Sequence, residues 1–397
     1  GITNGSGDQK LGEVITLTVN TSEDITVVTS GGTPNLTLNT GDVVSYASGS
    51  GSSALVFTYT IGAGDNVDDL QVVGFALNGG TFEDSAGNAL STGPIVTNPV
   101  GILVIDVAAP SAPVITAISD DTGVVGDKIT SDTTLIISGT GEVGASVQVS
   151  LASAEVGSAV TVDSDGNWSY THAATLSAAS HSFTAVATDA ATNASSASSA
   201  YVVTVDTTAP TVTIDQIATD DTLNASETAS PLVVSGTTSG VADGQTVTLT
   251  VNGKTFAGLV SGGEYSIGLS AVEVSALTGA ETFAVDVSDV AGNTATQATR
   301  VLTVDSTGPT ITAVATTGTG ITSGAGNLNA DDTVTITLTA SAATTIAGGT
   351  PTLSLSGGGQ ATYASGSAST SLVFTYIVAS GENTADLEVI GFNTGGA

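Results

Sequence analysis

The sequence contains no cysteine and no methionine, and only four of its 397 residues are lysine or arginine. Without cysteine, disulfides and thiolate metal sites are excluded. The 37 aspartates and glutamates leave a formal charge of −33, and a surface this negative repels nucleic acid and anionic membranes. No apolar run approaches the roughly 20 residues of a membrane helix. We therefore expect neither nucleic-acid binding nor membrane insertion.

Groups that usually carry catalysis are equally scarce. The two histidines, His172 and His181, lie in no His-Glu-x-x-His context, and no serine occupies a Gly-x-Ser-x-Gly elbow. The glycine run at 357–359 lacks the Lys-Ser/Thr of a phosphate loop. A single tryptophan provides little for carbohydrate stacking. The sequence therefore predicts no catalytic residues, no enzyme, and no cofactor other than a metal ion.

The residues that dominate instead are Thr, Ser, Val, Ala and Gly, which favour strands and turns. A hydrophobic content of 40% is enough to build cores and argues against disorder. Period-2 alternation, as at Phe183, Ala185 and Ala187, is typical of strands with one buried face. Seven short strands per hundred residues predict immunoglobulin-like sandwiches. The expected fold class is all-β: a tandem array of such domains forming an elongated rod.

The chain is punctuated by one motif, a β-branched run that ends at an aspartate and is followed four residues later by proline. Its prolines are Pro110, Pro210 and Pro309, which are 100 and 99 residues apart. A repeat of this length indicates a string of domains. The predicted repeats are 1–109 and 309–397, both of a longer type, and 110–209 and 210–308, both shorter.

The outer two repeats are close relatives, because residues 46–50 and 55–59 recur at 363–367 and 372–376. Aligned in this way, the first repeat lacks its first strand and the last repeat lacks its final strands. Two explanations stay open: a fragment of a longer array, or strand exchange with a neighbouring subunit in a homopolymer.

Acidic residues recur at matched places around each motif. We expect each Asp-x-Ala-x-Asn turn to share a pole of its domain with the aspartate that ends the last strand, and the acidic pair of the next repeat to face both. Calcium takes six to eight oxygen ligands, so such a junction predicts a calcium site; the alternative is that Asp and Asn simply form turns. The candidate ligands are Asp84, Asp106, Asp120, Asp121, Asp127, Asp189, Asp206, Asp220, Asp221, Asp289, Asp305 and Asp331, with Asp132 adding to the acid density of the second repeat.

A further acidic stretch, from Asp163 to Asn167, resembles the start of an EF-hand loop. Its twelfth position is Ala174 in place of glutamate, and its flanks are predicted strands. We interpret it as a hairpin turn that presents Trp168 and Tyr170 to a core.

Taken together, the Asp-Thr-Thr-Ala-Pro junction, the Asp-Asp-Thr-Gly opening at 120–123, the hairpin at 165–170 and the Asp-x-Ala-Gly-Asn turn at 289–293 resemble the bacterial Ig-like repeats of giant surface adhesins, of RTX and biofilm-associated type. The resemblance implies a secreted, cell-surface protein whose repeats form a calcium-rigidified extender. Neighbouring repeats and calcium ions would be its partners. The alternatives are a subunit of an extracellular filament built by strand donation, and a carbohydrate- or protein-binding module.

Overall fold

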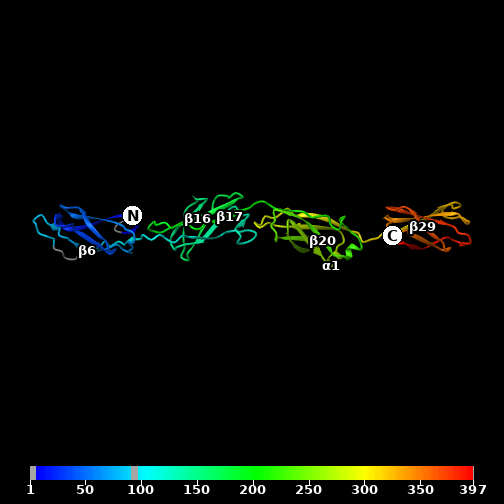
Figure 1. Cartoon of the computed structure of the whole chain (residues 1–397), viewed down its shortest axis with the longest axis horizontal. Coiled ribbons are helices and arrows are strands. Elements are labelled where there is room, and N and C mark those ends of the chain that lie inside the picture. Colours follow the sequence, from blue (N-terminus) through cyan, green and yellow to red (C-terminus); the bar gives the residue numbers. More distant parts are fainter. Residues whose placement is uncertain (1–5, 91–96, 397) are drawn as a thin grey trace.

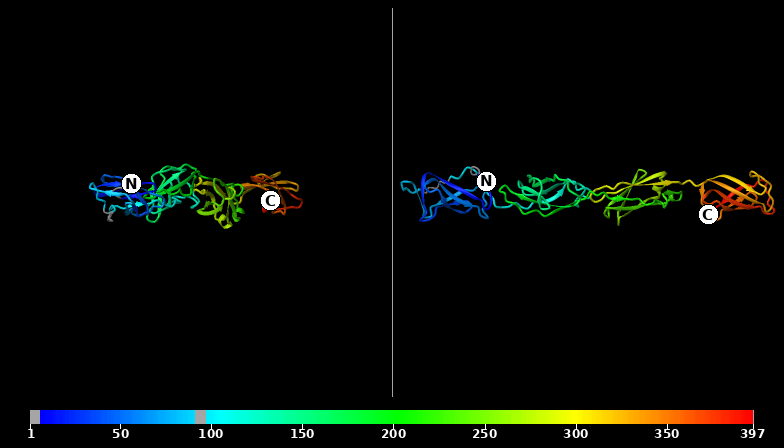
Figure 2. Two further views of the ribbon diagram at one scale, coloured as in Figure 1. Left: turned by 60° about the vertical axis from the view of Figure 1, so that its left-hand side comes forward. Right: turned by 90° about the horizontal axis from the view of Figure 1, so that it is seen from above.

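The computed structural model describes residues 6–90 and 97–396. Figure 1 shows β-sandwich domains following one another along a single axis, and the two views of Figure 2 keep this elongated arrangement. Each described domain has its own hydrophobic cluster, built from one continuous part of the sequence. The predicted all-β array of Ig-like domains is confirmed, while the exact boundaries between repeats stay predictions.

The first domain is built around a six-stranded sheet in the order β6-β3-β4-β5-β2-β7, with β1 and β8 paired in parallel beside it. Its core holds Phe57 and Phe82, each at most 1% exposed. The strands are β1 Gly7–Gln9, β2 Val14–Val28, β3 Asn35–Leu38, β4 Val43–Ser48, β5 Ser52–Thr60, β6 Val72–Ala76, β7 Thr81–Glu83 and β8 Leu103–Ile105.

The second domain has two facing sheets, β15-β11-β9 and β10-β17-β16-β12-β13, with β14 paired to β12. Trp168 of one sheet and Phe183 of the other belong to the same core cluster. The strands are β9 Val114–Ile118, β10 Ile129–Thr130, β11 Ile136–Thr140, β12 Ser146–Leu151, β13 Ala154–Glu155, β14 Val160–Thr161, β15 Asn167–Thr171, β16 Ser180–Thr188 and β17 Tyr201–Val205.

The third domain repeats this plan with sheets β18-β20-β23 and β19-β25-β24-β21-β22. It adds a one-turn helix, α1 Ala271–Val274, and a 3-10 turn, η1 Glu227–Ala229. A capping box between Ser270 and Glu273 stabilises the N-terminus of α1. The strands are β18 Thr211–Val212, β19 Thr222–Leu223, β20 Leu232–Ser239, β21 Thr246–Val251, β22 Lys254–Leu259, β23 Glu264–Leu269, β24 Gly279–Asp286 and β25 Ala298–Val304.

The fourth domain is a six-stranded sheet in the order β26-β27-β30-β29-β28-β31. Its strands are β26 Ile311–Gly318, β27 Thr333–Thr344, β28 Thr352–Leu355, β29 Gln360–Ser365, β30 Ser369–Ile377 and β31 Val389–Asn393. In the described parts of all four domains, no helix is long and apolar enough to cross a membrane.

Candidate metal sites at the domain junctions

The aspartate that ends the last strand of each of the first three domains lies in the same local structure. Asp106, Asp206 and Asp305 follow β8, β17 and β25, and each of these strands pairs in parallel with a short strand, β1, β10 or β19. The amide of each aspartate donates to a carbonyl of that short strand, at 3.0, 2.9 and 2.9 Å. One carboxylate oxygen accepts from the backbone N–H two residues on, which is an Asx turn.

The Asp-x-Ala-x-Asn turns also share one geometry. In the second domain, Asp189 accepts the backbone N–H of Asn193 on Oδ1 at 2.8 Å and the side-chain amide on Oδ2 at 2.9 Å. The turns that begin at Asp84 and Asp289 make the same bonds. The side-chain amide and backbone N–H of Asn88 hold the pKa of the Asp84 carboxyl below its usual value. These carboxylates are therefore already used in shaping their turns.

Each of the two inner turns contacts the preceding domain. The Asn193 side-chain amide donates to the carbonyl of Asp106 at 2.9 Å, and the amide of Asn293 donates to Asp206 at 2.8 Å. The prediction that a turn shares a pole with the strand end of its own domain is therefore wrong. The last strand crosses the sandwich, so the turn before it and the aspartate after it lie at opposite poles. Asp84 accordingly lies away from Asp106.

The acidic pair Asp120-Asp121 is also displaced from its predicted junction. It follows β9, which crosses the second domain, and belongs to a segment of residues 120–132 that we name the junction loop. This loop contacts the turn of the third domain: Val124 N donates to Val290 O at 3.0 Å and Ser131 N donates to Ala291 O at 3.2 Å. The pair therefore lies at the second junction and not the first.

The junction loop and the turn fit closely. The Thr122 hydroxyl donates to the Ala291 carbonyl, and Ala291 is fully buried. Gly123 has a φ of +73°, and a Cβ placed there would lie 2.1 Å from the Val290 carbonyl oxygen. Only glycine combines this backbone angle with this approach. The sequence contained the glycine, but nothing in it indicated which segment approaches it.

Two carboxylate oxygens of the junction loop are buried without a hydrogen-bond partner: Oδ1 of Asp121 and Oδ2 of Asp132. The second oxygen of each is satisfied, by the N–H of Gly126 at 2.7 Å and that of Thr134 at 2.8 Å. A buried, unpaired carboxylate oxygen is unfavourable, so these atoms fit a cation ligand. Within 6–90 and 97–396, however, no group of three or more His, Cys, Asp or Glu side chains gathers closely enough to hold a metal by itself.

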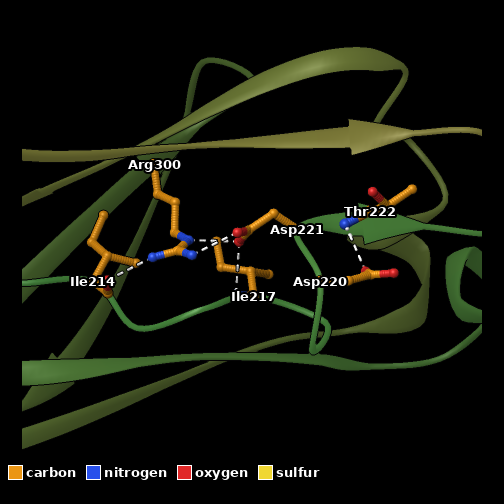
Figure 3. Close-up of polar contacts among 6 residues, drawn as sticks. All are labelled: Ile214, Ile217, Asp220, Asp221, Thr222 and Arg300. Atoms are coloured by element: carbon orange, nitrogen blue, oxygen red, sulfur yellow. Dashed lines mark hydrogen bonds and ion pairs between the residues drawn. The ribbon is translucent and has the colours of Figure 1, made fainter.

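Within the third domain, one of the predicted calcium ligands is bound by an arginine (Figure 3). Arg300 on β25 binds both carboxylate oxygens of Asp221, with Nε 2.6 Å from Oδ1, and it also donates to the Ile214 carbonyl. This pairing holds the pKa of the Asp221 carboxyl below its usual value and raises that of Arg300. Asp220 points away and accepts the N–H of Thr222 at 2.9 Å. Asp221 is thus paired with arginine, in a position predicted for a calcium ligand.

The backbone shows which segment of the second domain corresponds to Asp220-Asp221 of the third, and it is not the pair Asp120-Asp121 that the sequence indicated. Lys128 and Asp221 both have left-handed backbones, with φ of 65° and 61°, and each accepts an N–H from the last strand at 2.9 Å. Tyr201 and Arg300 also correspond, because each lies opposite the core phenylalanine of the neighbouring strand. Asp220-Asp221 therefore matches Asp127-Lys128. Asp120-Asp121 and Asp220-Asp221 are equally spaced from their junctions, but they occupy different positions in their domains.

In the second domain this corner holds a cation–π contact. The Lys128 ammonium lies 4.3 Å from the centre of the Tyr201 ring. Asp127 accepts the N–H of Ile129 at 2.8 Å, as Asp220 does that of Thr222. The same backbone position thus carries a lysine over an aromatic ring in one domain and an aspartate bound to arginine in the next.

Asp331 does not reach the third junction. It precedes β27, and the antiparallel pairing of β26 with β27 puts that end of the domain far from Asp305. Asp331 has a left-handed backbone, and its N–H donates to Val378 O at 2.9 Å. The prediction that Asp305 and Asp331 share a junction is wrong, because one strand length separates them.

The stretch that resembles an EF-hand is a hairpin turn between β14 and β15. Asp163 Oδ1 accepts the backbone N–H groups of Asp165 and Asn167, both at 2.9 Å. Trp168 and Tyr170 are 3% and 6% exposed in the core, and the Trp168 indole N–H donates to Thr140 O at 3.1 Å. The structure agrees with the interpretation as a hairpin turn.

This fold, with its repeated junctions, defines a class: a tandem array of Ig-like β-sandwiches. The sequence profile of the bacterial Ig-like domain family matches residues 108–207, and the resemblance seen in the sequence is confirmed. No curated protein sequence matches the chain.

Solved structures similar to the chain include parts of large bacterial adhesins. One, described as a Ca²⁺-stabilised adhesin with which an Antarctic bacterium binds ice, is 26% identical, with 93% of this chain and 88% of that chain covered and a TM-score of 0.42. A bacterial immunoglobulin-like domain of the M. primoryensis ice-binding adhesin is 43% identical over 25% of this chain and 99% of its own, with a TM-score of 0.21. A tetra-tandem repeat from the extending region of a large adhesion protein is 21% identical, covering 96% and 92%, with a TM-score of 0.31.

Proposed function

We propose that the chain is part of the extracellular stalk of a bacterial surface adhesin, and that calcium stiffens its second junction. The observation that carries the proposal is the junction loop, where two buried carboxylate oxygens without partners lie in a segment that contacts the next domain. A spacer of this kind works mechanically: it holds a distal part of its parent protein at a distance from the cell, without catalysis.

Asp121 and Asp132 are the residues that would hold the ion, together with backbone carbonyls of the junction loop. Bound calcium would supply positive charge to oxygens that no protein donor satisfies. Asp106, Asp206 and Asp305 are further candidates, because one oxygen of each makes only a local Asx bond. Asp120 and Asp127 add negative charge at the second junction, and Asp220 does so at the third.

The remaining predicted ligands fit other roles. Asp84, Asp189 and Asp289 use both oxygens inside their own turns, and Asp221 is neutralised by Arg300. We therefore propose that the three turn aspartates shape docking surfaces. Extracellular calcium modules bind at about 10⁻⁴–10⁻³ M, so the second junction would be loaded outside the cell.

The test is small-angle scattering and metal analysis of the chain in 5 mM calcium and in chelator. We expect about one calcium ion bound per chain at this concentration, released by chelator. We also expect spin labels on the second and third domains to report a narrower distance distribution with calcium than without. Absence of bound calcium at this concentration would overturn the metal proposal, and the hydrogen-bonded junction would then be the only source of stiffness.

A further inference from the structure

The turn that contacts the preceding domain differs at one position between the two inner domains. The fourth residue of the Asp-x-Ala-x-Asn turn is Thr192 in the second domain and Gly292 in the third. Both have left-handed backbones, with φ of 69° and 86°. Both also donate their N–H to the carbonyl of the aspartate that begins the turn, at 3.2 Å. The backbone of the turn is therefore the same in the two domains, and the side chain is what differs.

The surroundings of this position also differ. Thr192 is exposed, whereas Gly292 is half-buried. A Cβ placed on Gly292 would lie 2.9 Å from the backbone N of Gly123 in the junction loop and 3.3 Å from its Cα. These atoms belong to the backbone, so they cannot turn aside as the end of a flexible side chain can. The junction loop can lie against this turn because residue 292 is glycine.

The close approach involves one glycine from each domain. A Cβ on Gly123 would in turn lie 2.6 Å from the backbone N of Gly292. Around this pair, the loop and the turn are joined by the hydrogen bonds described above. The bond from Asn293 to the preceding domain, by contrast, has an equivalent at Asn193. The asparagine bond is thus common to both turns, whereas the contact with the loop requires glycine.

We infer that this turn position determines which repeat can follow which. A repeat with glycine there, as in the third domain, accepts a junction loop from the domain before it. A repeat with a side chain there, as in the second domain, excludes such a loop and keeps the asparagine bond alone. The partner that the glycine turn fits is a loop like Thr122-Gly123-Val124, which presents a hydroxyl and an N–H on either side of its own glycine. This selection acts through shape, so it does not depend on the calcium proposal.

The experiment is amide hydrogen exchange on the full chain carrying Gly292→Thr, compared with the unmodified chain in 5 mM calcium. Three amides distinguish docking from folding. The N–H of Val124 donates across the junction, that of Gly126 donates within the junction loop at 2.7 Å, and that of Asn293 donates within the turn at 2.9 Å. We expect exchange at Val124 to accelerate by at least about ten-fold. Exchange at Gly126 and Asn293 should be unchanged.

Gly87→Thr is the matched control. Gly87 occupies the same turn position in the first domain, with the same φ of 86°, but a Cβ there meets nothing within 4 Å. The N–H of Asn88, which donates to Asp84 at 2.8 Å, should therefore keep its protection. Gly292→Asn is a second variant, because asparagine adopts a left-handed backbone more readily than threonine does. It should release Val124 in the same way.

Unchanged exchange at Val124 in either variant at position 292 would overturn the inference. Faster exchange at Asn293 as well as at Val124 in both variants would also overturn it, because the turn itself would then have failed. Both outcomes differ from a failure of the calcium proposal, which would appear as an absence of bound metal in the unmodified chain.

Discussion

The second and third junctions begin with nearly the same linker sequence and produce different joints. At the second, Pro210 is buried and Ala291 of the next domain is fully buried against the junction loop. At the third, Pro309 and Asp305 are exposed, and no hydrogen bond joins the third and fourth domains among their described residues. Figure 1 shows a single extended segment, in yellow, leading into the fourth domain.

This comparison shows that the sequence of the linker does not determine how stiff the junction between two domains is. The second joint is made by a loop and a turn that lie far from the linker in sequence, and each is held in shape within its own domain. The third joint has no counterpart of the junction loop, because Asp220-Asp221 leads directly into β19. Since hydrogen bonds join the two domains at the second junction and none joins them at the third among the described residues, we interpret the second junction as stiff and the third as a hinge.

The largest effect is expected from Gly123→Val. Its side chain would collide with the Val290 carbonyl and prevent the three hydrogen bonds between the junction loop and the third domain. At about 0.5–1.5 kcal/mol each, their loss removes roughly 1.5–4.5 kcal/mol of docking free energy. The spin-label distance distribution across the second junction should become as broad as that across the third.

Gly126→Val is the matched control for this change. Gly126 also has a left-handed backbone, with φ of +94°, in the same loop, but a Cβ there meets nothing within 4 Å. It carries the backbone strain without the collision, so the second junction should stay narrow. If Gly126→Val broadens the distribution as much as Gly123→Val does, loop strain and not docking explains the result.

How far the sequence predicts this molecule depends on which contacts are local. Strands such as β9, at Val114–Ile118, follow from alternation and turn residues, and the Asx turns follow from aspartate itself. The grouping of the acids could not be predicted, because it depends on which pole of a sandwich each loop occupies. The Arg300–Asp221 pair joins residues 79 positions apart, and no local pattern announces it. The one-turn helix α1 is too short for helical periodicity to reveal.

A second effect concerns calcium and the two unpaired oxygens. In Asp121→Asn with Asp132→Asn, the stabilisation of the second domain by 10 mM calcium should disappear. For a Kd of about 0.1–1 mM, that stabilisation is about 1.4–2.7 kcal/mol. Urea unfolding with and without calcium measures it. Asp220→Asn is the control at the third junction and should retain the full response; an unchanged response in the double variant would exclude these two oxygens as ligands.

Proteolysis gives a smaller effect but compares the joints within one molecule. An endoproteinase that cleaves before aspartate meets the same Thr-Val-Asp sequence at Asp206 and at Asp305. Because Asp305 is exposed and no hydrogen bond joins the domains at its junction within the part of the chain that the structure describes, cleavage there should be about ten-fold faster. Mass spectrometry of early fragments provides the ratio. Gly123→Val should bring the two rates together, and equal rates in the unmodified chain would contradict the hinge.

The smallest effect concerns the acid titration of Asp221, which is paired with Arg300 at the position where the second domain has Lys128 over Tyr201. Arg300 lowers the pKa of Asp221, so this pair stabilises the third domain above the ordinary aspartate pKa of about 3.9, and the stabilisation is lost as pH falls through the lower folded value. Carbon NMR should show the Asp221 carboxyl titrating below the ordinary aspartate pKa. Arg300→Tyr introduces the residue that the second domain has at this position. It should return the pKa of the Asp221 carboxyl toward its ordinary value and make the free energy of unfolding less dependent on pH in acid. Tyr201→Phe keeps the ring under Lys128 and should leave this pH dependence unchanged. If Asp221 titrates normally in the unmodified chain, the pair is not formed in solution, and the two corners differ in sequence alone.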